Sequence, residues 1–220
     1  MADQKIFKPE NMAVDGPQKN FLEELNLPPQ VEDFLLAWYK VLLIGAAAVL
    51  VAVLAYSFGS QYVSSREERA AEQLAQAMRL DEEAKRAAAL REVADDYRRT
   101  GAGVWGRLEL AHLRRDDGDL QAAATAYEEL LGSLSRRDPR HPMIRLSLAE
   151  VLRELGADDR AAEHYRQLAQ TAGYEAWGLL GGARILERQG ETAAAAEKYQ
   201  QVVELANAPA LLVEQAKQGR

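Results

Sequence analysis

One residue pattern occurs three times in the second half of the chain, and it constrains the fold more than any other feature. The pattern is a Gly, an Ala five residues later and a Tyr four residues after that Ala. A further Ala stands seven residues before each Gly, and an aliphatic residue stands three residues after each Tyr. The matching residues are Gly118, Gly156 and Gly190; Ala123, Ala161 and Ala195; Tyr127, Tyr165 and Tyr199; Ala111, Ala149 and Ala183; and Leu130, Leu168 and Val202. Three matches at five aligned positions, with spacings of 38 and 34 residues, indicate an internal repeat.

Each copy of this pattern predicts two antiparallel helices joined by a tight turn. The chain after residue 62 is rich in Ala, Glu, Arg and Leu and has almost no β-branched runs, which favours helices. The Gly is expected to end the first helix, where the chain turns through a positive φ. The small Ala residues are expected where the two helices approach most closely, and the Tyr is expected to face the next hairpin. Because each hairpin buries its apolar side only against a neighbour, the sequence predicts a continuous stack.

The spacing and the small and aromatic positions resemble those of the tetratricopeptide repeat, which has a period near 34 residues. We therefore predict an all-α fold with an α-solenoid of such hairpins. Three repeats are expected within residues 101–208, after a linker helix and degenerate hairpin at 60–100 and before a capping helix at 209–220. Asp81 is the predicted N-cap of a helix that ends near Tyr97.

An uninterrupted apolar segment precedes the repeats. Residues 41–58 read VLLIGAAAVLVAVLAYSF and contain no charged residue. In a helix they cover about 27 Å, close to the thickness of a hydrocarbon core. Trp38 and Tyr39 stand at one end and Tyr56 and Tyr62 at the other, where aromatic rings favour the headgroup region. We predict a single transmembrane helix at 38–59; the alternative is an Ala-rich core helix of a soluble protein.

The first 37 residues form an N-terminal arm, which we expect to be partly disordered with short amphipathic helices. Its functional interpretation is an interfacial or partner-docking helix, and the alternative is a plain tether. The apolar segment begins only at residue 41, whereas secretory signals usually end by about residue 30. An uncleaved signal anchor is therefore expected.

The residues offer no recognisable catalytic, cofactor or metal site. The chain has no Cys, and its three His residues are too widely spaced to form a common metal-ligand motif. The Gly pairs match no phosphate loop, and Gly178, Gly181 and Gly182 are instead expected at close-packing positions on one helix. A net charge of −7, with no basic run along the sequence, argues against nucleic acid as a partner. We expect no enzymatic activity, no cofactor, no metal and no small-molecule substrate.

In tetratricopeptide stacks the first helix of each repeat lines the concave face, usually through its second, fifth, ninth and twelfth positions. From these positions we predict a partner-binding groove lined by Trp105, Leu108, His112, Glu150, Arg153, Trp177, Leu180 and Arg184. Leu108, Leu146 and Leu180 are expected to form an apolar strip between the two indoles, which suits an unfolded chain or a partner helix. The alternative is that both Trp residues belong to the core between repeats. Leu at the fifth positions also argues against the carboxylate clamp of cytosolic chaperone-binding repeats.

The order of parts also resembles the YfgM-like inner-membrane proteins of bacteria, most closely in the stretches RLELAHLRRDDGDLQAAATAY and GYEAWGLLGGARILERQGE. The resemblance implies a single-pass inner-membrane protein with a periplasmic C-terminal domain, associated with the Sec translocon, periplasmic chaperones and their clients. The charges near the span, two Lys before it and three Arg after it, do not decide this orientation.

Two functions follow from these observations. The leading hypothesis is a non-enzymatic membrane-anchored adaptor whose repeats bind protein partners in Sec-dependent export or envelope protein folding. The alternative is a structural scaffold that tethers another membrane or envelope assembly, such as one for cell division or cytochrome maturation, including the arrangement in which the repeats are cytoplasmic.

Overall fold

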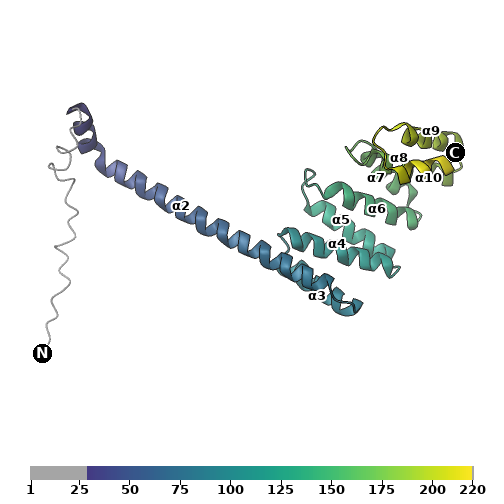
Figure 1. Cartoon of the computed structure of the whole chain (residues 1–220), viewed down its shortest axis with the longest axis horizontal. Helices are drawn as coiled ribbons and strands as arrows, with labels where there is room; N and C mark the ends of the chain where they lie inside the picture. Colours follow the sequence, from purple (N-terminus) through teal and green to yellow (C-terminus); the bar gives the residue numbers. More distant parts are fainter. Residues whose placement is uncertain (1–28, 220) are drawn as a thin grey trace. The chain divides into compact units, whose positions relative to one another are not determined.

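The computed structural model describes residues 29–219, with side chains from Ala37 onward, and all regular structure in this range is helical (Figure 1). The predictions for residues 1–28 lie outside the described residues. The helices are α2 (Pro29–Met78), α3 (Glu83–Asp96), α4 (Gly101–Asp116), α5 (Leu120–Ser133), α6 (His141–Glu154), α7 (Asp158–Ala169), α8 (Glu175–Arg188), α9 (Thr192–Glu204) and α10 (Ala210–Gln218). The chain divides into two units, residues 1–62 and 63–220, and α2 contributes to both.

The described part of the first unit is the apolar portion of α2. This helix contains a candidate membrane span within Ala37–Met78, whose most apolar window has a mean hydropathy of 2.5 and no buried residue. Large hydrophobic side chains are exposed throughout residues 38–63, from Leu42 at 46% to Tyr56 at 79%. A core helix of a soluble protein would bury one side of this surface. By its length and composition, this helix is therefore a candidate to cross a membrane.

The second unit is a stack of helical hairpins, α4–α5, α6–α7 and α8–α9, as the repeats predict (Figure 1). The first helix of each hairpin ends two residues before a glycine of the repeat, and Gly118, Gly156 and Gly190 have φ of 80°, 74° and 83°. After each glycine, the next backbone N–H donates to a carbonyl five residues earlier, for example Asp119 to Arg114 at 2.8 Å. These contacts satisfy the last carbonyls of the helix. The predicted glycine turns are confirmed.

The other repeat positions form the core. All twelve of these Ala, Tyr and aliphatic side chains are 3% exposed or less. Tyr165 on α7 packs against α8 of the next hairpin, because a Cβ atom added to Gly181 would lie 2.1 Å from its ring. The prediction that the Tyr faces the neighbouring hairpin is therefore confirmed for this repeat.

Close packing between hairpins depends on two of the three glycines of α8. A Cβ atom at Gly178 would lie 2.1 Å from the backbone nitrogen of Ala169, and Gly181 is equally crowded. At Gly182 the nearest neighbour would be the side chain of Lys198 at 3.6 Å, an ordinary contact. The close-packing prediction is correct for the first two glycines and wrong for Gly182. Gly178 faces the backbone of α7 and Gly181 the buried ring of Tyr165, whereas Gly182 faces a flexible side chain at an ordinary distance.

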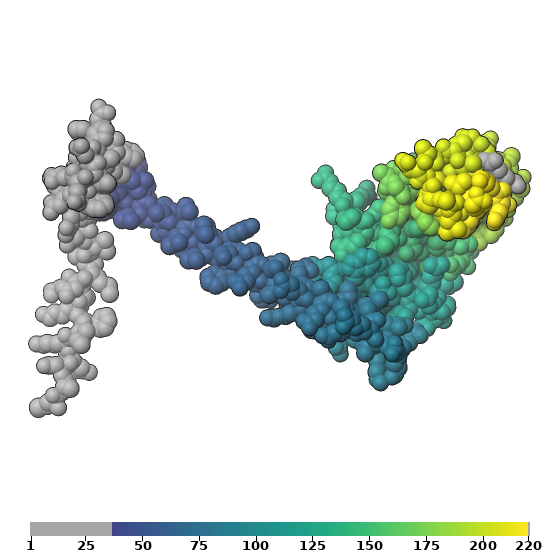
Figure 2. Space-filling model, viewed as in Figure 1, coloured from purple at the N-terminus to yellow at the C-terminus, as the bar shows by residue number. Residues whose placement is uncertain are grey.

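Both ends of the stack carry additional helices. At the N-terminal end, Ala70 of α2 is buried against Val93 of α3 and Ala102 of α4. At the C-terminal end, Leu212 and Ala216 of α10 join the core of α8 and α9, and a space-filling view shows these last residues (yellow) at the end of the packed repeats (Figure 2). The predicted cap at Asp81 is wrong: α3 begins at Glu83, and its N-cap is Glu82, which makes no capping bond through its side chain.

Candidate protein-binding surfaces

The first helices of the repeats, α4, α6 and α8, carry all of the predicted groove residues. Trp105 on α4 is 38% exposed and Trp177 on α8 is 36% exposed. Each indole therefore leaves part of a large apolar surface exposed and buries the rest. Their role in binding stays a prediction.

The predicted apolar strip between the indoles is wrong. Leu108 is fully buried and Leu180 is 2% exposed, while Leu146 is partly buried against the core. Leu108 lies three residues before Ala111, so both share the side of α4 that packs into the core with Tyr127. The small Ala lets the helices approach closely enough to cover the Leu beside it. The predicted groove residues that stay at least partly exposed are therefore the two indoles, His112 and the charged side chains of Glu150, Arg153 and Arg184.

The charged groups at the centre of this surface bind one another. Glu150 on α6 accepts a hydrogen bond from the hydroxyl of Tyr165 at 2.7 Å and another from Arg153 at 2.6 Å. Burial alone would raise the pKa of Glu150, but these two hydrogen bonds lower it overall. Burial and the neighbouring carboxylate raise the pKa of Tyr165, so its hydroxyl stays a donor. Glu150 and Arg153 thus form a fixed, half-buried pair.

The same tyrosine position has different partners in the other repeats. The hydroxyl of Tyr199 donates to Glu187 at 2.8 Å, whereas that of Tyr127 is buried and has no hydrogen-bond partner among the described residues. The ring of His112 lies 5.8 Å from that of Tyr127, at the helix position that Glu150 occupies in the second repeat. The first repeat therefore lacks the tyrosine–carboxylate bond of the other two.

The last predicted groove residue contacts the C-terminal helix. Arg184 on α8 donates to the side-chain oxygen of Gln215 on α10 at 3.0 Å. Helix α10 therefore occupies one hydrogen-bonding direction of Arg184. Within the described range, no three His, Asp or Glu side chains gather as a metal site requires.

A second polar surface lies on the other side of α4. Successive residues turn by about 100° around a helix axis, which places Arg107 and Arg114 opposite Trp105. Two clefts open there. The smaller, of about 280 Å³, is lined by residues of α3, α4 and α5, and the larger, of about 780 Å³, lies near the start of α4. Both are lined by Arg98 and Arg107.

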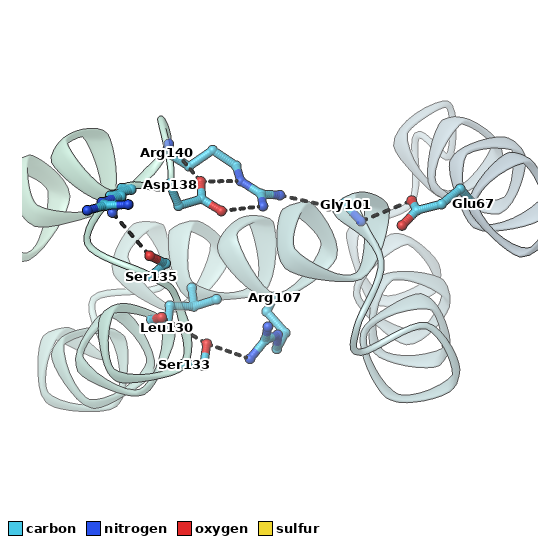
Figure 3. Close-up of polar contacts among 9 residues, drawn as sticks. Glu67, Gly101, Arg107, Leu130, Ser133, Ser135, Asp138 and Arg140 are labelled. Atoms are coloured by element: carbon cyan, nitrogen blue, oxygen red, sulfur yellow. Dashed lines mark hydrogen bonds and ion pairs between the residues drawn. The ribbon is translucent and has the colours of Figure 1, made fainter. Parts of the chain in front are cut away.

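The larger cleft is held by a network around the N-terminus of α4 (Figure 3). Arg140 donates to both carboxylate oxygens of Asp138, at 2.9 and 2.8 Å, and to the carbonyl of Gly101 at 3.2 Å. The backbone N–H of Gly101 donates in turn to Glu67 at 3.1 Å. The hydrogen bonds from Arg140 hold the pKa of Asp138 down at about 2. Asp138 is therefore ionised at neutral pH and already has its cation.

Arg107 has no carboxylate partner of this kind within the part of the chain that the structure describes. It donates only to the hydroxyl of Ser133, at 3.3 Å, and its buried Nε has no hydrogen-bond partner among the described residues (Figure 3). Burial, together with the charges of Arg98 and Arg140, lowers the pKa of Arg107. This guanidinium is therefore held in a positive environment with unused donors.

Comparison with known proteins agrees with the repeats. A family model described as a tetratricopeptide repeat-like domain matches residues 32–216. The chain belongs to this family. Its structure resembles the crystal structure of a tetratricopeptide repeat protein from Parabacteroides merdae ATCC 43184 with a TM-score of 0.57, over 70% of this chain and 57% of that chain. At 15% identity this likeness shows the fold alone, and no curated protein matches the sequence.

Membership of the tetratricopeptide repeat family indicates the general role of the second unit. Such repeats typically bind proteins and generally act as non-catalytic scaffolds. Sequence reasoning predicted a binding surface on the first helices but did not predict the arginine clefts. The clefts depend on tertiary structure, because their arginines lie on α3 and the turn after it, on α4, and on the loop before α6. The six residues are Arg91, Arg98, Arg99, Arg107, Arg114 and Arg140. The one available signal is the spacing of Arg107 and Arg114, two helical turns apart.

Proposed function

We propose that the chain is a non-enzymatic, membrane-anchored adaptor of the bacterial inner membrane. Residues 38–59 serve as the anchor, and the repeats at 101–208 bind protein partners from the periplasm. The partners belong to Sec-dependent export or envelope protein folding, namely translocon components, periplasmic chaperones or their clients. This proposal combines the tetratricopeptide repeat fold with the apolar portion of α2 and with the resemblance to YfgM-like proteins.

The single observation that carries the binding role is the partial exposure of two indoles on one type of helix. Trp105 and Trp177 occupy the same position in α4 and α8 and are 38% and 36% exposed. Trp is enriched among residues that dominate protein interfaces because it buries a large, rigid surface and retains an N–H donor. The fixed pair of Glu150 and Arg153 lies on the helix between them and supplies polar contacts at low entropic cost.

The anchor is supported by exposure and length. No residue of the most apolar window of α2 is buried inside the protein. Eighteen residues in a helix match the hydrocarbon core, so a bilayer would cover the surface that the protein leaves open. The repeats would then remain close to the membrane while they bind a partner.

In-cell photo-crosslinking tests the adaptor function. A photoreactive phenylalanine at position 105 or 177 is expected to capture the same envelope or Sec component from living bacteria. Position 155 is the matched control, because Leu155 is also 38% exposed but lies at the end of α6. Capture at 105 and 177 with little at 155 supports the proposal. Failure of both positions to recover any envelope or Sec component would contradict it, as would capture of one folded assembly of another kind.

A further inference from the structure

The two clefts on the second side of α4 share their walls and their charge. Arg98 and Arg107 line both clefts, so the clefts adjoin each other along α4. Six arginines and four carboxylates line them in total. This local excess of positive charge stands in a chain whose net charge is −7.

Most of these arginines form no ion pair with a carboxylate among residues 37–219. Within residues 37–219, Arg140 is the one cleft arginine that forms an ion pair, and its partner is Asp138. Of the other three cleft carboxylates, Glu67 accepts from the backbone of Gly101. Like charges placed together oppose folding, because each raises the electrostatic free energy of the others. An external anion would relieve that repulsion and use the free donors.

We propose that the adjoining clefts form a docking site for an acidic segment of a partner protein. Guanidinium groups bind carboxylates through two parallel hydrogen bonds, which gives both strength and orientation. The partly exposed Leu110 and Leu134 also line the clefts, so aliphatic side chains of the same segment find apolar contacts. A cleft of about 780 Å³ suits several residues of a chain better than one small anion.

This site differs from the groove of the proposed function. It lies on the opposite side of α4 from Trp105, so both surfaces can be occupied at once. The inference therefore stands even if the first-helix surface binds nothing, and a failure of either test leaves the other informative.

Binding of an acidic peptide to the full chain in non-ionic detergent tests the inference. The probe is a fluorescein-labelled octapeptide, Glu-Glu-Leu-Glu-Glu-Leu-Glu-Glu, and the same peptide with Gln in place of Glu is the reference. Fluorescence anisotropy is expected to show binding of the Glu peptide that is at least about tenfold tighter, and that weakens as salt screens the charges. Equal affinity for the two peptides would overturn the inference.

Paired variants locate the site. The double variant Arg98→Gln/Arg107→Gln is expected to weaken binding of the Glu peptide by about tenfold or more. The control Arg160→Gln/Arg166→Gln removes the same charge from exposed positions of α7 and is expected to change the affinity less than about threefold. Similar effects of both double variants would overturn the inference, since only net charge would then matter.

Thermal unfolding separates a docking site from a structural one. Removing two like charges is expected to leave the unfolding temperature of the Arg98→Gln/Arg107→Gln variant unchanged or raised. If that variant does not fold, Arg91→Gln/Arg114→Gln replaces it, because both of these arginines are exposed at the smaller cleft. Loss of binding in the replacement variant supports the inference, and unchanged binding overturns it. A last comparison uses competitors that displace the labelled Glu peptide, each expressed as its concentration of negative charges. If inorganic phosphate or phosphatidylglycerol vesicles displace it at a lower charge concentration than the unlabelled Glu peptide does, the inference is also overturned.

Discussion

Replacing Gly178 with Ala is expected to destabilise the repeats by about 3 kcal/mol, the upper range for overpacking of a tight core. The added Cβ would lie 2.1 Å from the backbone nitrogen of Ala169 and 2.7 Å from its Cα. These are backbone atoms of α7, so the clash is relieved only if α7 and α8 move apart. The gain in helix propensity from Gly to Ala, about 1 kcal/mol, is too small to compensate. Urea unfolding followed by circular dichroism measures the loss.

Gly182→Ala is the matched control on the same helix. Its Cβ would meet only the side chain of Lys198, at 3.6 Å, so the variant is expected to be as stable as the wild type or up to about 1 kcal/mol more stable. If Gly178→Ala is as stable as the wild type, or if both variants lose the same free energy of unfolding, α7 and α8 do not approach as closely as described.

Tyr165→Phe is expected to cost about 1.5–3 kcal/mol, the range for a hydrogen bond to a charged group. The change removes the donor 2.7 Å from Glu150 and leaves a half-buried carboxylate with one partner fewer. Because this hydrogen bond lowers the pKa of Glu150 in the folded state, it stabilises the folded protein fully at pH values above 4.5, the ordinary pKa of a Glu. This stabilisation is lost as the pH falls through the lowered pKa of Glu150 in the folded protein. Unfolding at several pH values should therefore show a difference between variant and wild type that shrinks in acid.

Tyr127→Phe provides the comparison, because the hydroxyl of Tyr127 is buried with no hydrogen-bond partner among the described residues. Removing it is expected to leave the free energy of unfolding unchanged or slightly higher. Equal losses for the two Phe variants would mean that the tyrosine–carboxylate bond does not distinguish the repeats.

The fold could be predicted because its constraints are local and repeated. The positive φ at the three turns favours glycine, which is found at Gly118, Gly156 and Gly190. Close helix contacts require small residues at fixed distances along the chain. Both requirements can therefore be recognised from the spacing of residues in the sequence. The end of α3 could also be placed to within one residue of Tyr97. The start of α3 could not be predicted, because Asp81 and Glu82 are neighbouring acidic residues. Only the backbone conformation shows which of the two is the N-cap.

The candidate surfaces were harder to predict, because exposure depends on how closely helices approach. Positions one turn apart share a helix side, so the sequence placed Leu108 and Leu180 with Trp105 and Trp177 although the core covers both Leu residues. The arginine clefts depend on the pairing of three segments and left no contiguous pattern. A charge cluster formed across helices becomes visible only when the stack is known.

The most direct test of a membrane-anchored adaptor with periplasmic repeats is a pair of C-terminal reporters in bacteria. Alkaline phosphatase fused after α10 is active only if exported, and a green fluorescent protein at the same site fluoresces only in the cytoplasm. We expect active phosphatase and a dark fluorescent fusion, both recovered in the membrane fraction. A fluorescent fusion with inactive phosphatase would contradict the periplasmic location, and recovery of both fusions in a soluble fraction would contradict the anchor.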